Sequence, residues 1–428
     1  MPRLRLALGQ TNPVVGDLDG NATQILAAAK RASAAGADLF AVGEMALSGY
    51  PIEDLASRPS FLAAAHDHVR VLAKQLLDAG LGDLPVIVGH PDGPYEPRLL
   101  GTSNAPTAIA RNRASVLQHG HVKADYSKHH LPNYSVFDEY RIFIPGDELL
   151  VLRIKGADVA LIICEDLWRD GGPVAKVLEA DAGLLVVINA SPFERDKDDV
   201  RLPLVTRRAV ETDTIVAYVN IVGGQDDLVF DGDSVVVSPS GEILARAPQF
   251  TEHLLVVDLE VAEASGSVLP DRVTRVELAS PSGPSTGSGT STSSVIATDI
   301  AVPPDDREQV WNALVLGLRD YVEKNGFRSV VLGLSGGIDS AVCAALAADA
   351  IGADRVWGVS MPSRYSSEGS RSDADDLAGN IGLHYSVEPI ADLVLPIENQ
   401  LKLTGTAAEN VQARIRGIIL MGLSNLHG

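Results

Sequence analysis

Residues 333–340 read GLSGGIDS, directly after the apolar run 329–332 and directly before the alanine-rich stretch 341–350. This order predicts a β-strand, a glycine-rich turn and the start of an α-helix. Gly336 and Gly337 are expected to turn the backbone with positive φ, so that several N–H groups face one anion at the helix N-terminus. A glycine turn that merely caps a helix is the alternative, and the full strand–loop–helix pattern argues against it. The segment therefore predicts a phosphate-binding loop.

The end of this loop separates it from one large class of nucleotide-binding loops. A Walker loop ends in Gly-Lys-Ser/Thr, with the lysine on the terminal phosphates, whereas this loop ends in Ile338-Asp339-Ser340. Backbone amides and the hydroxyls of Ser335 and Ser340 suit a pyrophosphate, and the carboxylate of Asp339 is free to hold magnesium. The segment resembles the loop of the N-type ATP pyrophosphatases, which transfer AMP. That resemblance implies an ATP site made of Gly333, Leu334, Ser335, Gly336, Gly337, Ile338, Asp339 and Ser340, with Asp339 as the magnesium ligand.

Composition narrows the class of protein. A chain of 428 residues with 46% hydrophobic and 21% charged residues predicts a soluble globular protein of two domains. A net charge of −21 without a compensating basic tract argues against nucleic acid as a partner. Cys164 and Cys343 lie far apart without zinc-site spacing, and Cys343 stands among alanines, where we expect a buried structural cysteine. With neither a signal peptide nor a run of ~18 apolar residues, we expect a cytoplasmic protein that binds no membrane.

A Ser-, Gly-, Thr- and Pro-rich stretch at 280–294 divides the chain. It cannot bury enough apolar surface to order itself, so we expect a first domain at 1–275, a linker at 276–300 and a second domain at 301–428. Both domains are predicted to be α/β, because strands and helices interleave in each. In the second domain their alternation indicates a doubly wound parallel sheet. Before the linker the expected strands are 4–8, 39–42, 86–88, 159–163, 184–188, 215–219 and 254–257, and the expected helices are 23–35, 61–77, 174–180 and 202–212; after it we expect strands at 329–332, 356–360 and 384–387 and a helix at 305–324.

Three segments of the first domain carry residues suited to catalysis. Glu44 closes an apolar strand, Lys128 precedes His129-His130-Leu131-Pro132, and Cys164 ends the strand 159–163. Each alone has a plain explanation: a glutamate in a loop, a solvated lysine, and a cysteine that acts as a small buried hydrophobe.

Together the three segments resemble the nitrilase/amidase superfamily, which places a Glu–Lys–Cys triad on an αββα sandwich. The resemblance implies that Cys164 attacks a carboxamide and that Glu44 takes the thiol proton and later protonates the departing ammonia. Lys128, with a backbone N–H just after Cys164, is then expected to stabilise the oxyanion. Glu139 is either the second glutamate of this family, which orients the lysine, or a loop charge.

The amide substrate follows from a closer resemblance. In glutamine-hydrolysing relatives, the positions that match Tyr134, Ser191 and Lys197 hold the glutamine head group. A lysine can pair with the α-carboxylate, and a serine can hydrogen-bond the zwitterion.

In the second domain the segment ENVQARIRG at 409–417 is strongly helical, with Asn410 and Arg414 on one face. It is either an amphipathic core helix or, with two arginines among aliphatics, a binder of anionic phosphates. Together with MPSRYSSEGS at 361–370 and the glycine loop, it resembles NAD synthetase, and this implies that Asn410 and Arg414 bind the dinucleotide.

With the nitrilase-like domain in front, the whole chain resembles the glutamine-dependent NAD synthetases. The implied ligase reaction converts nicotinic acid adenine dinucleotide, ATP, glutamine and water into NAD, AMP, pyrophosphate and glutamate, with ammonia passed through a sheltered tunnel. Self-association through the nitrilase-like domain is also expected. The alternative is a carbon–nitrogen hydrolase with a nucleotide-binding appendage and no synthetase activity. The family pattern continues beyond residue 428 with further ATP- and magnesium-binding residues, so we expect the chain as given to be a poor NAD synthetase.

Overall fold

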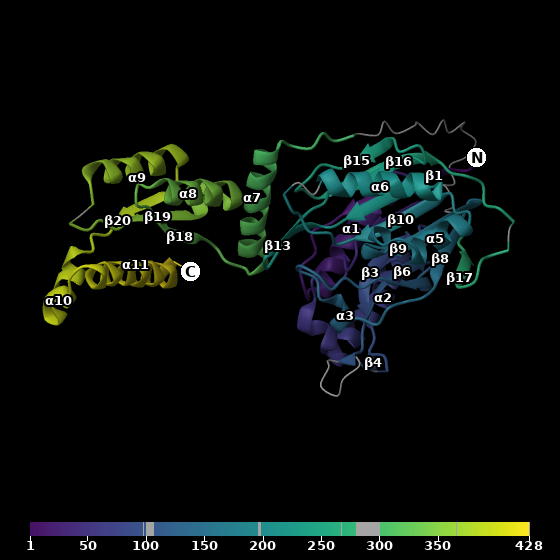
Figure 1. Ribbon diagram of the computed structural model, residues 1–428, viewed down its shortest axis with the longest axis horizontal. Coiled ribbons are helices and arrows are strands. Elements are labelled where there is room, and N and C mark those ends of the chain that lie inside the picture. The colour runs from purple at the N-terminus through teal and green to yellow at the C-terminus, as the bar shows by residue number, and fades with distance from the viewer. Residues whose placement is uncertain are drawn as a thin grey trace. The chain divides into compact units, whose positions relative to one another are not determined.

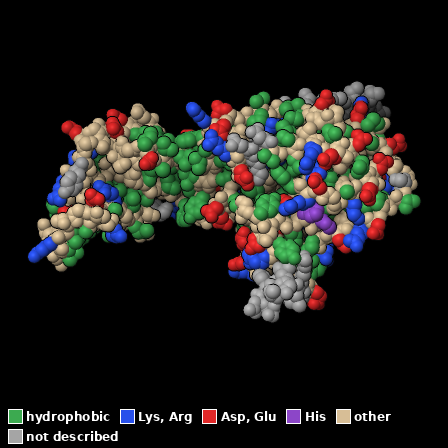
Figure 2. All heavy atoms as spheres, viewed as in Figure 1, with side chains coloured by type: hydrophobic (Ala, Val, Ile, Leu, Met, Phe, Trp, Pro, Cys, Tyr) green, Lys and Arg blue, Asp and Glu red, His purple; other side chains and the backbone are tan. Residues whose placement is uncertain are grey.

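The computed structural model describes residues 1–96, 98–99, 107–195, 198–266, 268–279, 300–364 and 366–427. The chain forms two compact units, Met1–Asp306 and Arg307–Gly428, whose elements are labelled in Figure 1. Among the described residues, none of the helices is both long and apolar enough to cross a membrane. On the face of the first unit seen in Figure 2, acidic and basic side chains are interspersed.

The first unit contains two large mixed sheets. In the six-stranded sheet the order is β16-β1-β2-β3-β6-β7, with bounds β1 (Arg3–Gln10), β2 (Leu39–Val42), β3 (Val86–Asp92), β6 (Arg111–Gln118), β7 (His121–Ser127) and β16 (His253–Glu260). The seven-stranded sheet has the order β15-β14-β11-β10-β9-β8-β17, with bounds β8 (Leu149–Ile154), β9 (Ala157–Ile163), β10 (Leu184–Asn189), β11 (Ile215–Asn220), β14 (Val235–Val237), β15 (Ile243–Arg246) and β17 (Val273–Glu277). The central strands β1, β2 and β3 run parallel, as do β9, β10 and β11.

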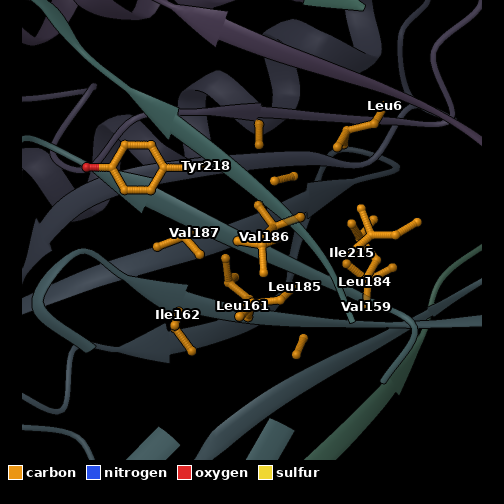
Figure 3. Packing of buried hydrophobic residues seen from close by; sticks show 14 of the residues in the cluster. Leu6, Val159, Leu161, Ile162, Leu184, Leu185, Val186, Val187, Ile215 and Tyr218 are labelled. Carbon is orange, nitrogen blue, oxygen red and sulfur yellow. The ribbon is translucent and has the colours of Figure 1, made fainter. Parts of the chain in front are cut away.

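Alternation along β1 explains how the layers stack. Leu6 belongs to the core between the two sheets, and Ala7 belongs to the core on the other face, under α1 (Leu18–Ala34) and α2 (Pro59–Asp78). In the second sheet, α5 (Gly172–Glu179) contacts β8 and α6 (Asp198–Thr212) contacts β11. Figure 3 shows the packed side chains of the inner core, which include Leu6, Leu161 and Val186. These layers confirm the predicted αββα sandwich.

Several strands of this unit were not predicted from the sequence, among them β8 and β14, which are apolar and buried. The strand β7 alternates between exposed and half-buried positions, so its hydrophobic signal is weak. The other unpredicted strands are β6, β8, β14, β15 and β17, together with the short pairs β4 (Arg98–Leu99) with β5 (Thr107–Ala108) and β12 (Val222–Gln225) with β13 (Leu228–Asp231). The remaining short helices are η1 (Glu53–Ser57), α3 (Glu139–Ile142) and α4 (Glu165–Trp168).

The second unit is a parallel sheet of order β18-β19-β20. Its strands are β18 (Val330–Gly333), β19 (Val356–Ser360) and β20 (His384–Val387), and its helices are α7 (Asp306–Lys324), α8 (Ile338–Ile351), η2 (Ala353–Arg355), α9 (Glu368–Ile381), α10 (Ala391–Leu401) and α11 (Thr406–His427). One face of the sheet packs on α7, α8 and α9, and the other packs on α10 and α11. Helices on both faces of a parallel sheet confirm the doubly wound class.

The expected domain boundaries stay a prediction. The strand β17 ends at Glu277, inside the proposed linker 276–300, and its pairing with β8 belongs to the first unit. The compact units divide between Asp306 and Arg307, so residues 300–306 group with the first unit. Residues 280–299 lie outside the described part of the chain.

Candidate active site

Glu44 and Cys164 approach each other where β2, β9 and β10 end. The backbone N–H of Cys164 donates to the carbonyl of Ile188 at 3.0 Å, and that of Glu44 donates to the carbonyl of Asn189 at 3.2 Å. Because Ile188 and Asn189 are consecutive on β10, the two side chains start from neighbouring points although they come from different sheets. Gly43 permits this contact, since a Cβ there would lie 2.8 Å from the Asn189 carbonyl oxygen.

The carboxylate of Glu44 is only 1% exposed and accepts three hydrogen bonds. Oε1 accepts from the Asn112 amide at 2.6 Å and from the Lys128 ammonium at 2.8 Å. Oε2 accepts from the backbone N–H of Ala190 at 2.9 Å. These contacts fix the orientation of the carboxylate.

Lys128 lies between two buried glutamates. Its Nζ is 2.8 Å from Oε1 of Glu44 and 2.9 Å from Oε1 of Glu139, which also accepts from the Tyr50 hydroxyl at 2.9 Å. Burial alone would lower the pKa of Lys128, but the charges of Glu139 and Glu44 outweigh it and raise that pKa, so the ammonium stays protonated. Burial raises the pKa of Glu139 to about 7 against the attraction of Lys128. The hydrogen bond between Glu139 and Lys128 is the contact expected of a second glutamate that orients the lysine.

Cys164 occupies a strained turn between β9 and α4. Its φ of 46° and ψ of −100° are unfavourable for a residue with a Cβ. The side chain is 6% exposed. Burial, followed by the charge of Glu44, raises the pKa of the Cys164 thiol, while Lys128 opposes the shift. The resting group is therefore a thiol, and a base must remove its proton before it can attack.

A cavity of about 330 Å³ is lined in part by Cys164. Its lining contains two predicted glutamine-binding residues, Tyr134 and Ser191, and also Phe137, Cys164, Glu165, Trp168, Glu194, Arg195 and Val200. Lys197, the third predicted residue, lies outside the described part of the chain.

Sequence reasoning did not single out Glu165 as a cavity residue. It is 4% exposed, and it accepts from the Tyr134 hydroxyl at 2.8 Å and from Arg169 Nε at 2.7 Å. The sequence did hold a signal for Glu165. This acid directly follows Cys164 at the end of a strand, so it lies in the same buried turn as the cysteine.

The glycine loop of the second unit connects β18 to α8. Gly336 has a φ of +79°, and a Cβ there would lie 2.1 Å from the Ser370 carbonyl oxygen, so this position requires glycine. The expectation for Gly337 was wrong: its φ of −90° and ψ of 155° are ordinary extended values. The hydroxyl of Ser335 accepts from the Gly337 N–H at 3.2 Å and lies 3.2 Å from the Ser340 hydroxyl.

A cavity of about 380 Å³ borders this loop. Its lining residues are Gly333, Leu334, Ser335, Val359, Ser360, Met361, Pro362, Ser366, Ser370, Arg371 and Arg416. The hydroxyl groups and two arginines suit an anionic nucleotide.

The two arginines of α11 face different ways. Arg414 is exposed and donates to the carbonyl of Asn410, one turn earlier on its own helix, at 3.1 Å. Neither Asn410 nor Arg414 is among the residues that line the cavity, so their role in dinucleotide binding stays a prediction. Arg416 does line it, because a step of two residues turns a helix by about 200°.

Two further expectations for α8 concern Asp339 and Cys343. Cys343 is exposed, so the expectation of a buried cysteine was wrong. Asp339 is an exposed residue in the first turn of the helix. Within the described residues there is no group of three acidic, histidine or cysteine side chains that could hold a metal ion. A single exposed carboxylate beside the glycine loop would fit magnesium that is held mainly by nucleotide oxygens and water.

Comparisons with known proteins identify the family to which each unit is similar. The carbon-nitrogen hydrolase family matches residues 5–266, and the NAD synthase family matches residues 310–428. The glutamine-dependent NAD(+) synthetase of Rhodobacter capsulatus is 41% identical over 436 residues, covering 100% of this chain and 70% of the relative. For the Aquifex aeolicus synthetase the identity is 40%, with 99% and 73% covered.

A solved structure extends the match to the fold. The glutamine-dependent NAD+ synthetase of Acinetobacter baumannii, in complex with ADP, superposes with a TM-score of 0.82 at 33% identity, covering 100% of this chain and 73% of that one. Relatives that match along the whole chain, at this level of identity, share both the nitrilase-like and the nucleotide-binding unit. The chain therefore belongs to the family of glutamine-dependent NAD(+) synthetases.

Proposed function

We propose that the first unit of this chain hydrolyses glutamine at Cys164 and that the second uses the ammonia to convert nicotinic acid adenine dinucleotide into NAD, with ATP cleaved to AMP and pyrophosphate. The observation that carries this proposal is the burial of Glu44, Lys128 and Cys164 around one edge of the sandwich, beside a cavity large enough for an amino acid. A hydrolase with an idle appendage is disfavoured by the full-length match to synthetases.

Hydrolysis begins with transfer of the Cys164 proton to Glu44. The sulfur then attacks the side-chain amide carbon of glutamine, and the Lys128 ammonium stabilises the oxyanion that forms. Glu44 returns the proton to the amide nitrogen, the C–N bond breaks, and ammonia leaves behind a γ-glutamyl thioester. A water molecule activated by Glu44 then attacks the thioester and releases glutamate and the thiol.

Glu44 fits the role of the base better than Glu139 does. Its charge has a larger effect on the pKa of Cys164 than that of Glu139. Glu139 instead holds Lys128 from the other side and accepts from Tyr50. It acts through the lysine, as a positioning residue.

Charge also suggests how the amino-acid end of glutamine binds. Glu165 supplies a buried carboxylate to the cavity and suits the α-ammonium of the substrate. Tyr134 and Ser191 add hydroxyl groups at the same cavity. Lys197 is proposed to pair with the α-carboxylate.

In the second unit the loop 333–340 is proposed to hold the phosphates of ATP, assisted by Arg371 and Arg416 from the cavity wall. The carboxylate of nicotinic acid adenine dinucleotide attacks the α-phosphorus of ATP, and pyrophosphate leaves. Ammonia then attacks the adenylated carbon, which expels AMP and leaves the carboxamide of NAD. Magnesium, held by Asp339, would neutralise charge on the phosphate oxygens.

Two further proposals come with the family. We infer a cytoplasmic location, where ATP is available, and self-association through the first unit. Sedimentation of the purified chain would test the second of these.

An isotope experiment tests the joint function. A protein carried to the length of its relatives is given glutamine labelled with ¹⁵N at the amide, together with nicotinic acid adenine dinucleotide, ATP and magnesium. The proposal predicts ¹⁵N in the carboxamide of NAD, and its loss in Cys164→Ala, which still forms NAD from free ammonium. Transfer of the label by Cys164→Ala would contradict it.

A further inference from the structure

We propose that Asp166 is a positioning residue that ties the Lys128 segment to the Cys164 turn, and that glutamine hydrolysis depends on this tie. The inference rests on the proposed glutaminase role of Cys164. Asp166 is fully buried in α4, two residues after the nucleophile. It is not among the residues that line the cavity.

Four hydrogen bonds reach this one carboxylate from three segments. Oδ1 accepts from the backbone N–H groups of His129 and His130 at 3.1 and 2.7 Å. Oδ2 accepts from the Tyr126 hydroxyl at 2.7 Å and from the backbone N–H of Ile163 at 3.2 Å. Each oxygen thus accepts two donors.

The donors flank the residues that carry the chemistry. His129 and His130 directly follow Lys128, while Ile163 directly precedes Cys164. Cys164 itself has the strained φ of 46°, which persists only where neighbouring contacts enforce it. By holding the N–H before the cysteine and the two N–H groups after the lysine, Asp166 fixes the turn and the distance between the two segments.

The backbone of Lys128 is held from a second side as well. Its N–H donates to the Asn112 carbonyl at 2.9 Å, and its carbonyl accepts from the Gly146 N–H at 2.8 Å. These bonds connect Lys128 to the first sheet and to the loop before β8. Asp166 is the contact that connects it to the nucleophile.

Only a carboxylate satisfies all four donors. Three of them are backbone N–H groups, which cannot accept a hydrogen bond. In Asp166→Asn one oxygen becomes an NH₂ group, which would face either the two histidine N–H groups or the Ile163 N–H. At least one contact of the tie is then lost.

Burial makes this carboxylate sensitive to pH. It raises the pKa of Asp166 to about 6, against the stabilising effects of the His130 N–H, the Tyr126 hydroxyl and the Lys128 charge. The other titratable groups at this place are His129, Glu165 and Arg169, and burial lowers the pKa of the His130 side chain to about 4. Protonation of Asp166 removes an acceptor, so the tie should loosen as the pH falls through about 6.

The test uses the full chain in a Cys343→Ser background, which leaves one thiol. Kinetics of glutamine hydrolysis and the rate constant for alkylation of Cys164 by iodoacetamide are measured for Asp166→Asn and Tyr126→Phe. Asp181→Asn is the matched control, because Asp181 is exposed and its φ of 53° suits asparagine equally well.

For Asp166→Asn we expect kcat to fall about 10²-fold, as misplaced catalytic groups typically do, while KM for glutamine stays within about twofold because the cavity is untouched. Tyr126→Phe should lower kcat by about 10-fold, the lower end of the effect of losing one hydrogen bond to a charged group. The ratio of wild-type to Asp166→Asn alkylation rates should fall toward one as the pH drops through about 6. Asp181→Asn should match the wild type.

If Asp166 has a purely structural role, Asp166→Asn should lower the melting temperature, while kcat per folded molecule is unchanged and the alkylation ratio does not depend on pH. That result would overturn the proposal. If Asp166→Asn does not fold, an unchanged kcat in folded Tyr126→Phe would overturn it equally. A wild-type protein that is alkylated at Cys164 but hydrolyses no glutamine would refute the glutaminase role instead. The alkylation ratio would still test whether Asp166 holds the two segments together.

Discussion

The ammonium of Lys128 donates to Oε1 of Glu44 at 2.8 Å, so the proposed oxyanion-stabilising cation and the proposed base are in direct contact before any substrate arrives. Both side chains are 1% exposed. Because the lysine keeps its proton, the buried carboxylate beside it has a permanent counter-charge. In the proposed mechanism, transfer of the thiol proton to Glu44 would weaken that contact and free the ammonium to attract the new oxyanion.

Selective labelling of the two cysteines should follow from their burial. Cys164 is buried and Cys343 exposed. A general alkylating agent should therefore modify Cys343 first, whereas a glutamine-shaped electrophile such as diazo-oxo-norleucine should modify Cys164. Peptide mass spectrometry reads out both. Cys343→Ser is the control, and an adduct of the glutamine analogue that persists in Cys164→Ala would show that the nucleophile is misassigned.

Removing the charge of Glu139 should change how stability depends on pH. The pKa of Glu139 is about 7 in the folded protein, against an ordinary value of 4.5. A raised carboxyl pKa means that the unfolded chain loses this proton first, so folding stability declines as the pH rises from about 4.5 to about 7. Glu139→Gln abolishes that component.

Thermal unfolding between these pH values measures the effect. The melting temperature of Glu139→Gln should rise relative to the wild type as the pH increases. Asp138→Asn, at a half-exposed neighbour paired with Arg141, is the control and should run parallel to the wild type. Parallel curves for Glu139→Gln would mean that Glu139 does not titrate as described.

Asn112→Ala should impair glutamine hydrolysis without preventing glutamine from binding in the cavity. The variant removes the 2.6 Å hydrogen bond to Oε1 of Glu44. A hydrogen bond to a charged group contributes about 1.5–3 kcal/mol, which corresponds to a loss of about 10- to 100-fold in kcat. Steady-state glutaminase kinetics check this, with Asn325→Ala, at an exposed residue of the second unit, as the control. A loss confined to KM would assign Asn112 to substrate binding instead.

Gly336→Ala should abolish ATP binding in the second unit. The added Cβ would lie 2.1 Å from the Ser370 carbonyl oxygen, in a backbone conformation with φ +79°. Calorimetric titration with ATP and magnesium measures the affinity, and labelling of Cys164 should be unaffected. Gly417→Ala is the matched control, because a Cβ there meets nothing within 4 Å. Equal ATP affinity in both variants would show that the loop 333–340 does not bind the phosphates.

The sequence predicted several strands and helices at or near their observed bounds. The strands β2, β19 and β20 have the predicted bounds. Helix α1 starts at Leu18, five residues before the predicted start, because Asp17 caps it by accepting from the Gly20 N–H at 2.9 Å. Edge strands such as β7 were not predicted because their exposed positions interrupt the pattern.

Within the site, family motifs identified the residues that are chemically distinctive, and missed those that matter through position. Glu44, Lys128 and Cys164 are found from local patterns, and the structure brings them together. Asn112 and Asp166 make hydrogen bonds to segments far away in the chain, and no local spacing reveals such partners. Arg416 was missed because the choice between helix faces depends on the packing of α11.

The most direct test of the central claim is to trap the covalent intermediate. The chain is mixed with glutamine and quenched in acid within one turnover, and its peptides are analysed by mass spectrometry while ammonia is assayed in parallel. The account predicts a γ-glutamyl adduct on the peptide that carries Cys164, and neither adduct nor ammonia from Cys164→Ala. Ammonia released by Cys164→Ala at the wild-type rate, or a glutamyl adduct on another residue, would contradict it.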